Sequence, residues 1–140
     1  MKILFLCHGN INRSAAGEII VKQKYPEHEV KSAGLKTKGG GITAKKMRDA
    51  LQELGYENNS IRSTMVTKEL IDWADVIFYM DYSNEKNLQE QFGIEVFSKA
   101  IRISKLLGID KIPDPNYEKT NELHKHVIKL LEMALDKYFQ

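Results

Sequence analysis

The sequence contains one cysteine in 140 residues, so the chain cannot form a disulfide bond within itself, and a reducing compartment is the simple expectation. It has no internal repeat, no low-complexity tract and no Pro- or Ser-rich linker, with only 3 prolines in total. Neither sign of charge dominates, because 21 Lys and Arg residues face 19 Asp and Glu residues. That balance argues against a dedicated DNA-binding domain. No apolar stretch approaches the length of a membrane span or of a signal-peptide core. We therefore expect a soluble cytoplasmic protein with no nucleic-acid partner and no membrane span.

The remaining composition, 42% hydrophobic and 29% charged, is that of one globular domain, which we place at residues 1–140. Strands and helices are expected to alternate along it. Apolar runs predict strands at residues 3–6, around 30–34, at 76–80 and, more weakly, at 101–104. Apolar spacing and capping residues predict helices at 14–25, 44–54, 67–73, 83–92, where Ser83 can form the cap, and along the final stretch from 123 to 138. This alternation indicates an α/β fold with a parallel sheet and helices on both faces.

In such a sheet the site lies at the carboxyl ends of the strands. The loop that leaves the first strand there reads Cys7-His8-Gly9-Asn10-Ile11-Asn12-Arg13-Ser14.

This loop contains the residue types that an oxyanion site needs. A short loop at a helix N-terminus turns its backbone N–H groups inward, and Gly9 and Asn10 tolerate the left-handed backbone that such a turn requires. Arg13 can hold two phosphate oxygens in a fork. The same positive field favours the thiolate form of Cys7, and the hydroxyl of Ser14 can donate to that sulfur.

These residues resemble the signature of the low-molecular-weight protein tyrosine phosphatases, Cys-x-Gly-Asn-x-Cys-Arg-Ser, directly after the first strand. The chain matches the signature at Cys7, Gly9, Asn10, Arg13 and Ser14. Three further segments resemble the family in the right order: Ser32-Ala33-Gly34, Met80-Asp81-x-Ser83-Asn84 and Pro113-Asp114-Pro115.

The resemblance implies a flavodoxin-like fold with a four-stranded sheet in the order 2-1-3-4. It implies that Cys7 is the nucleophile, Arg13 the phosphate clamp and Asp114 the general acid. Ser14 would hold the thiolate, while Asn10 and Ser32 would support the loop. The phosphate would lie within the loop residues His8, Gly9, Asn10, Ile11, Asn12, Arg13 and Ser14. No metal and no cofactor are implied.

The chain departs from the family pattern at several positions. Asn12 replaces the second cysteine of the signature, and the segment 61–64 lacks the histidine that supports the loop asparagine in many members. The usual aromatic wall after Ser-Ala-Gly is missing, which leaves Tyr117 as the aromatic residue that could flank a phenyl ring. Ile11 is the residue type of tyrosine-directed members, whereas members that act on phosphoarginine tend to have Thr there. A local basic stretch, Lys36 to Arg48, could favour acidic phosphopeptides.

We therefore predict a monomeric, metal-independent phosphatase of phosphotyrosine in protein substrates that works through a phosphocysteine intermediate. Two alternatives remain at this point. One is an arsenate reductase of the same fold, which would need an external thiol because the chain has no further cysteine. The other is a phosphate- or phosphopeptide-binding module without activity, although pure binding would not need Asp114.

Overall fold

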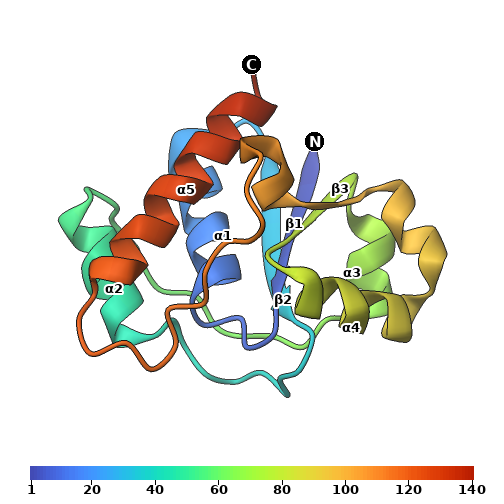
Figure 1. Cartoon of the computed structure of the whole chain (residues 1–140), viewed down its shortest axis with the longest axis horizontal. Coiled ribbons are helices and arrows are strands. Elements are labelled where there is room, and N and C mark those ends of the chain that lie inside the picture. The colour runs from blue at the N-terminus through green and yellow to red at the C-terminus, as the bar shows by residue number, and fades with distance from the viewer.

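The computed structural model describes all 140 residues and contains one four-stranded sheet (Figure 1). Its strands are β1 (Lys2–Cys7), β2 (Glu29–Gly34), β3 (Val76–Tyr79) and β4 (Ala100–Arg102). They lie in the order β2-β1-β3-β4, and every pairing is parallel. The predicted fold class and strand order are therefore confirmed.

Strand β1 forms the centre of the molecule. Its side chains alternate between two separate hydrophobic clusters, as the pleat of a strand requires. Ile3 and Phe5 belong to the cluster on one face, and Leu4 and Leu6 belong to the cluster on the other face. All four side chains are inaccessible to solvent. A central parallel strand is apolar on both faces because helices cover both.

The helices form one layer on each face of the sheet (Figure 1). On the Ile3 face lie α1 (Arg13–Lys24), α2 (Lys45–Glu53) and α5 (Glu122–Tyr138), and on the other face lie α3 (Lys68–Trp73) and α4 (Tyr82–Phe92). Two short 3₁₀ helices, η1 (Ile94–Ser98) and η2 (Ile103–Leu107), flank β4. The first nine residues of α1 are all buried, because α1 lies between the sheet and α5. A Cβ atom at Gly17 would stand 2.6 Å from the ring of Phe5, so glycine lets α1 approach the sheet closely.

Two sequence-based expectations were wrong in detail. The fourth strand was expected to run to Ser104, but it ends at Arg102 and Ile103 begins η2. Ser104 turns inward there, where its hydroxyl bonds the carbonyl of Asp110. Ser83 was expected to cap α4, but Asp81 does so, two residues earlier, by accepting a hydrogen bond from the N–H of Asn84 at 2.8 Å.

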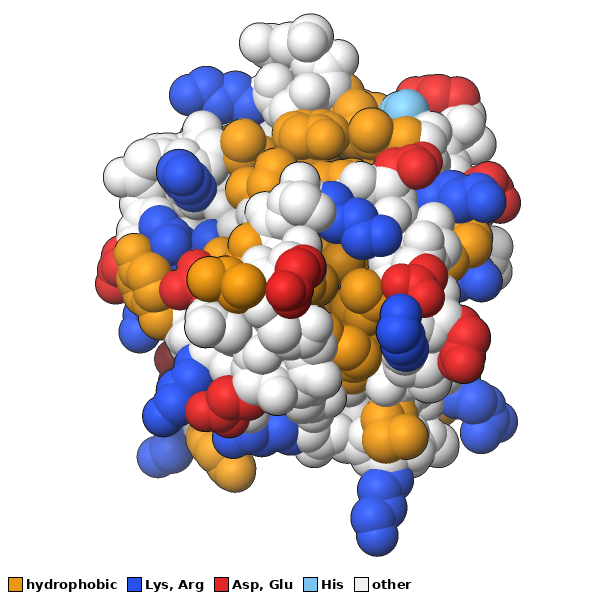
Figure 2. All heavy atoms as spheres, turned by 90° about the vertical axis from the view of Figure 1, so that its right-hand side faces the viewer, with side chains coloured by type: hydrophobic (Ala, Val, Ile, Leu, Met, Phe, Trp, Pro, Cys, Tyr) orange, Lys and Arg blue, Asp and Glu red, His pale blue; other side chains and the backbone are white.

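The face formed by α4 and η1 mixes charges of both signs with scattered apolar side chains (Figure 2). No helix in the structure has the combination of length and apolar character that crossing a bilayer requires. The parallel strands all point the same way, so their carboxyl ends meet at one edge of the sheet. That edge carries the loop after β1 and the segment after β3.

Candidate active site

Cys7 is the last residue of β1, and the loop after it curls over the N-terminus of α1. Close packing against β2 holds the start of the loop, because a Cβ atom at Gly34 would come within 2.6 Å of the carbonyl oxygen of His8. The loop forms the wall of a cavity of about 220 Å³. The residues that line this catalytic cavity are Cys7, His8, Gly9, Asn10, Ile11, Asn12, Arg13, Lys36, Asp114 and Asn116.

The sulfur of Cys7 is surrounded by hydrogen-bond donors. The backbone N–H of Asn10 points at Sγ from 3.3 Å, and the hydroxyl of Ser14 lies 2.9 Å from it. The side-chain amide of Asn10 donates to the same hydroxyl at 2.8 Å. Because this bond occupies the Ser14 oxygen as an acceptor, the one hydroxyl proton is free to point at sulfur. Two hydrogen-bond donors therefore face the sulfur of Cys7.

Asn10 fixes the shape of the loop. Its φ of 56° lies in the left-handed region, which asparagine tolerates better than most residues. Its side chain is fully buried and also donates to the Ser32 hydroxyl at 2.9 Å. Its Oδ1 accepts a hydrogen bond from the backbone N–H of Thr64 at 3.0 Å. Every polar atom of the side chain is therefore paired, and the strained backbone is held from several sides.

A buried carboxylate ends this network beneath the loop. Glu18 of α1 is 8% exposed and accepts a hydrogen bond from the Ser32 hydroxyl at 2.7 Å. Lys22, one turn further along the helix, pairs with its other oxygen at 2.6 Å. The charge is buried but neutralised, as buried charges generally are.

The segment after α2 supports the loop without the family's histidine. Ser63 donates its hydroxyl proton to the carbonyl of Gly9 at 3.0 Å, and the backbone of Thr64 binds Asn10. The Ser63 hydroxyl and the Thr64 backbone amide therefore support a loop that lacks the family's histidine.

Arg13 is aimed by two groups from elsewhere in the fold. One terminal nitrogen donates to Asp81 at 2.8 Å and to the carbonyl of Ile112 at 2.8 Å. The other terminal nitrogen lies 3.8 Å from Asp114. Burial disfavours the ionised Asp81, but the N–H of Asn84 and the Arg13 guanidinium outweigh it and lower the pKa of Asp81. Asp81 therefore stays charged and holds the guanidinium towards the cavity.

Asp114 reaches the catalytic cavity from an exposed loop. Its side chain is 55% accessible and accepts a hydrogen bond from the backbone N–H of Asn116 at 3.0 Å. Tyr117 adopts a φ of 71° and is 93% exposed. It lines a neighbouring cavity and not the catalytic one, so no Phe, Tyr or Trp side chain lines the catalytic cavity in this structure.

His8 and Lys36 also line the cavity. The Nε2 atom of His8 lies 3.2 Å from the side-chain amide of Asn87 on α4. Burial and the nearby Lys36 lower the pKa of His8, so the imidazole is neutral at neutral pH. Elsewhere in the structure no three His, Cys, Asp or Glu side chains gather in a way that could hold a metal ion.

Comparison with known proteins places the chain in a family. The sequence pattern of the family described as low molecular weight phosphotyrosine protein phosphatase matches residues 2–140. The chain belongs to this family. Family membership supports a phosphatase function.

Individual relatives cover nearly the whole chain. The probable low molecular weight protein-tyrosine-phosphatase AmsI of Erwinia amylovora is 29% identical over 136 residues, which are 97% of this chain and 93% of AmsI. The solved structure of the YwlE arginine phosphatase from Geobacillus stearothermophilus superposes with a TM-score of 0.87 at 31% identity and covers 98% of this chain and 89% of its own. Wzb of Vibrio vulnificus in complex with benzylphosphonate gives a TM-score of 0.87 at 28% identity, with 98% and 95% covered.

The structure also adds residues for which the sequence had suggested no role in this family site. Asp81 follows the end of β3 and was noted as part of a motif, yet its contact with Arg13 was not predicted. The signal was present, because a carboxylate at the carboxyl end of a central strand lies beside the first loop. Glu18 had no such signal, since an acidic residue on a helix is usually solvated.

Proposed function

We propose that the protein hydrolyses phosphotyrosine in protein substrates through a phosphocysteine intermediate. The observation that carries this proposal is the convergence of Cys7, Arg13 and Asp114 on one cavity, with two hydrogen-bond donors on the sulfur. A binding module would need the backbone N–H groups and the arginine, but it would need neither a supported thiolate nor a carboxyl group beside the bound phosphate.

In the first step Cys7 attacks phosphorus as a thiolate. The sulfur–phosphorus bond forms, and the bond from phosphorus to the phenolic oxygen of tyrosine breaks. Asp114 gives its proton to that oxygen, so tyrosine leaves neutral. The loop N–H groups and the Arg13 guanidinium bind the phosphoryl oxygens, while Ser14 stabilises the sulfur when it later becomes the leaving group.

In the second step water hydrolyses the intermediate. The Asp114 carboxylate takes a proton from the water, whose oxygen attacks phosphorus as the sulfur–phosphorus bond breaks. The products are inorganic phosphate and the Cys7 thiolate, so no external oxidant or reductant is consumed. The exposure of Asp114 suits this role, because both substrate and water must reach it.

Trapping of the intermediate tests the proposal. A rapid acid quench during turnover of a phosphotyrosine peptide should leave phosphate covalently bound to Cys7, found by mass spectrometry of the peptide that contains it. With an activated aryl phosphate, whose leaving group needs no proton, the Asp114→Asn variant should accumulate more of it, because the second step loses its base. Turnover without any such adduct would contradict the mechanism.

Phosphoarginine is the second candidate substrate, because one similar solved structure is titled an arginine phosphatase. Ile11 favours phosphotyrosine. In contrast, the cavity has no Phe, Tyr or Trp wall with which to select a phenyl ring, which leaves room for phosphoarginine. Steady-state rates on matched phosphotyrosine, phosphoserine and phosphoarginine peptides decide between them. Faster cleavage of phosphoarginine would replace the tyrosine assignment.

Arsenate reduction is tested in the same preparation. The lone Cys7 would have to pass its arsenic adduct to an external thiol, since the chain has no second cysteine. Arsenite formation with glutathione or thioredoxin present, together with negligible phosphopeptide turnover, would favour the reductase.

A further inference from the structure

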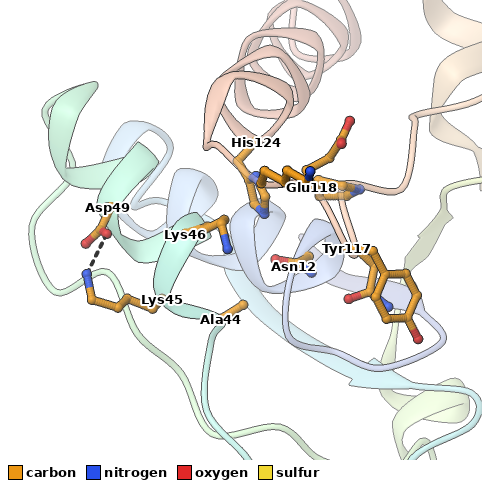
Figure 3. A pocket seen from close by; sticks show the side chains of 11 residues that line it. Asn12, Ala44, Lys45, Lys46, Asp49, Tyr117, Glu118 and His124 are labelled. Atoms are coloured by element: carbon orange, nitrogen blue, oxygen red, sulfur yellow. Dashed lines mark hydrogen bonds and ion pairs between the residues drawn. The ribbon is translucent and has the colours of Figure 1, made fainter.

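A second and larger cavity, of about 660 Å³, adjoins the catalytic one. It lies between the N-terminal ends of α2 and α5 and the loop that carries Asp114 (Figure 3). Asn12 and Asn116 line both cavities. A ligand in this second cavity would therefore lie next to a phosphate in the catalytic loop.

Two buried polar side chains line this cavity with unpaired atoms. His124 of α5 is 3% exposed, and its Nδ1 atom has no hydrogen-bond partner. Asn12 is 7% exposed, and its Oδ1 atom also lacks a partner. Figure 3 shows both side chains extending towards the same space as the Lys46 ammonium. Buried polar groups are normally paired. The ring nitrogen of His124 can donate to an oxyanion, whereas the Oδ1 atom of Asn12 can only accept a hydrogen bond.

The charges around the cavity favour an anion. Lys45 is neutralised by Asp49 at 2.8 Å. Lys46 and Lys119 make no ion pair, and Glu118 is the one lining carboxylate that also makes none. One positive charge is therefore left over at the cavity, beside the positive field of the catalytic loop. Burial and Lys46 lower the pKa of His124, which leaves a neutral imidazole able to donate one hydrogen bond.

We infer that this second cavity binds an oxyanion of the substrate itself: the carboxylate of an acidic residue, or a second phosphate, near the phosphotyrosine. The inference rests on the proposed function. A carboxylate or phosphate would interact with the Lys46 and Lys119 ammonium groups and with the His124 and Asn12 side chains. The substrates would then be phosphopeptides with an acidic residue on the side of the phosphotyrosine that faces α2 and α5.

A peptide series tests the inference. Each peptide has one phosphotyrosine in an alanine background and one Glu, Lys or phosphoserine at a position within about three residues of it, since each extended residue spans roughly 3.3–3.6 Å. At one or more positions, Glu and phosphoserine should raise kcat/KM about threefold to fivefold over Ala at low salt, mainly through KM. The preference should fall as salt is added.

Variants locate the effect. Lys46→Ala should bring the Glu-to-Ala ratio of kcat/KM close to one, and Lys46→Glu should reverse it in favour of the Lys peptide. Both substitutions are at an exposed position, so folding should survive. The matched control is Lys24→Ala, which removes the same charge at the far end of α1 and should keep the wild-type ratio.

Four results would overturn the inference: no position at which Glu is preferred, the same ratio in wild type and Lys46→Ala, an equal loss in Lys24→Ala, or inhibition by sulfate that depends on Lys46 when the Ala peptide is the substrate. The sulfate result would show that the cavity binds a free oxyanion and not a group of the substrate. Should wild type fail to hydrolyse phosphotyrosine at all, the proposed function fails separately. Binding of the Glu and Ala phosphopeptides to Cys7→Ser then decides on the cavity.

Discussion

The loop that follows β1 and the loop that carries Asp114 meet at one cavity, but they are built in opposite ways. The first is buried at Asn10 and from Asn12 onward, and Asn10, its strained residue, has every side-chain polar atom paired. The second exposes more than half of the Asp114 side chain and nearly all of Tyr117. A phosphate needs donors that are already in place, whereas a proton donor must meet substrate and water in turn. Phosphate binding therefore depends on donors fixed in the buried part of the fold, whereas proton transfer depends on an exposed carboxyl group.

Changing the nucleophile should have the largest effect, because it removes turnover but leaves phosphate binding in place. Cys7→Ser removes the thiolate but keeps the backbone donors and Arg13, so turnover of aryl phosphates should fall below about one per cent of wild type. Vanadate or phosphate should still bind. The rate is measured by phosphate release and the binding by calorimetry. Higher residual turnover would reveal another nucleophile.

Changing the acid should reduce catalysis without affecting the fold. Asp114→Asn keeps the side-chain shape but cannot donate a proton, so kcat/KM, which reports the first step, should drop about 10²–10⁴-fold with poor leaving groups and little with activated ones. Because Asp114 is exposed, the unfolding free energy should stay within about 0.5 kcal/mol of wild type. A leaving-group series and urea denaturation measure both. An equal drop across the series would mean that Asp114 only positions Arg13.

Changing the supporting asparagine should affect stability as well as rate. Asn10→Ala leaves buried hydroxyl and amide groups without partners, which should lower the unfolding free energy by about 1–3 kcal/mol. The matched control is Asn116→Ala in the loop that carries Asp114. Asn116 bonds Asp114 through its backbone N–H, which alanine keeps, so the unfolding free energy should fall by no more than about 0.5 kcal/mol. Equal losses in urea denaturation would remove the contrast between the loops.

The smallest effect concerns His124, the buried imidazole near the loop that carries Asp114. Burial lowers its pKa in the folded state, so the unfolded chain, with an ordinary value of about 6.5, takes up the proton first as pH falls. The contribution of the neutral His124 to the unfolding free energy is therefore present above about pH 6.5 and is lost as the pH falls below that value. Lys46, Glu118 and Asp114 act on the same group.

The measurement is the unfolding free energy at pH 7.5 and at pH 5.5. His124→Gln should flatten the change between these values by less than about 1 kcal/mol. The control is His126→Gln, which lies on the same helix but is exposed, and which should leave the change as in wild type. A steeper change in His124→Gln would contradict the sign.

Most of the fold followed from local patterns. The apolar runs at residues 3–6 and 76–80 predicted strands, the first of them covered on both faces, and their alternation with helices predicted the parallel sheet. The end of β4 was missed because it depends on the contact between Ser104 and Asp110 in the folded chain. The cap of α4 is local, and Asp81 and Ser83 are equally suitable cap residues, so propensity did not separate them.

The sequence by itself determined the sheet, the loop after the first strand and its family, because these depend on residue types at short spacing. Tertiary structure alone decided which distant groups hold that loop and what lies beside it. Ser32, Thr64 and Asp81 reach it from three other segments, and Asn12 and His124 are 112 positions apart yet border one cavity. The physical reason is that hydrogen bonding and burial act between neighbours in space, and spatial neighbours are fixed only when the helices pack on the sheet.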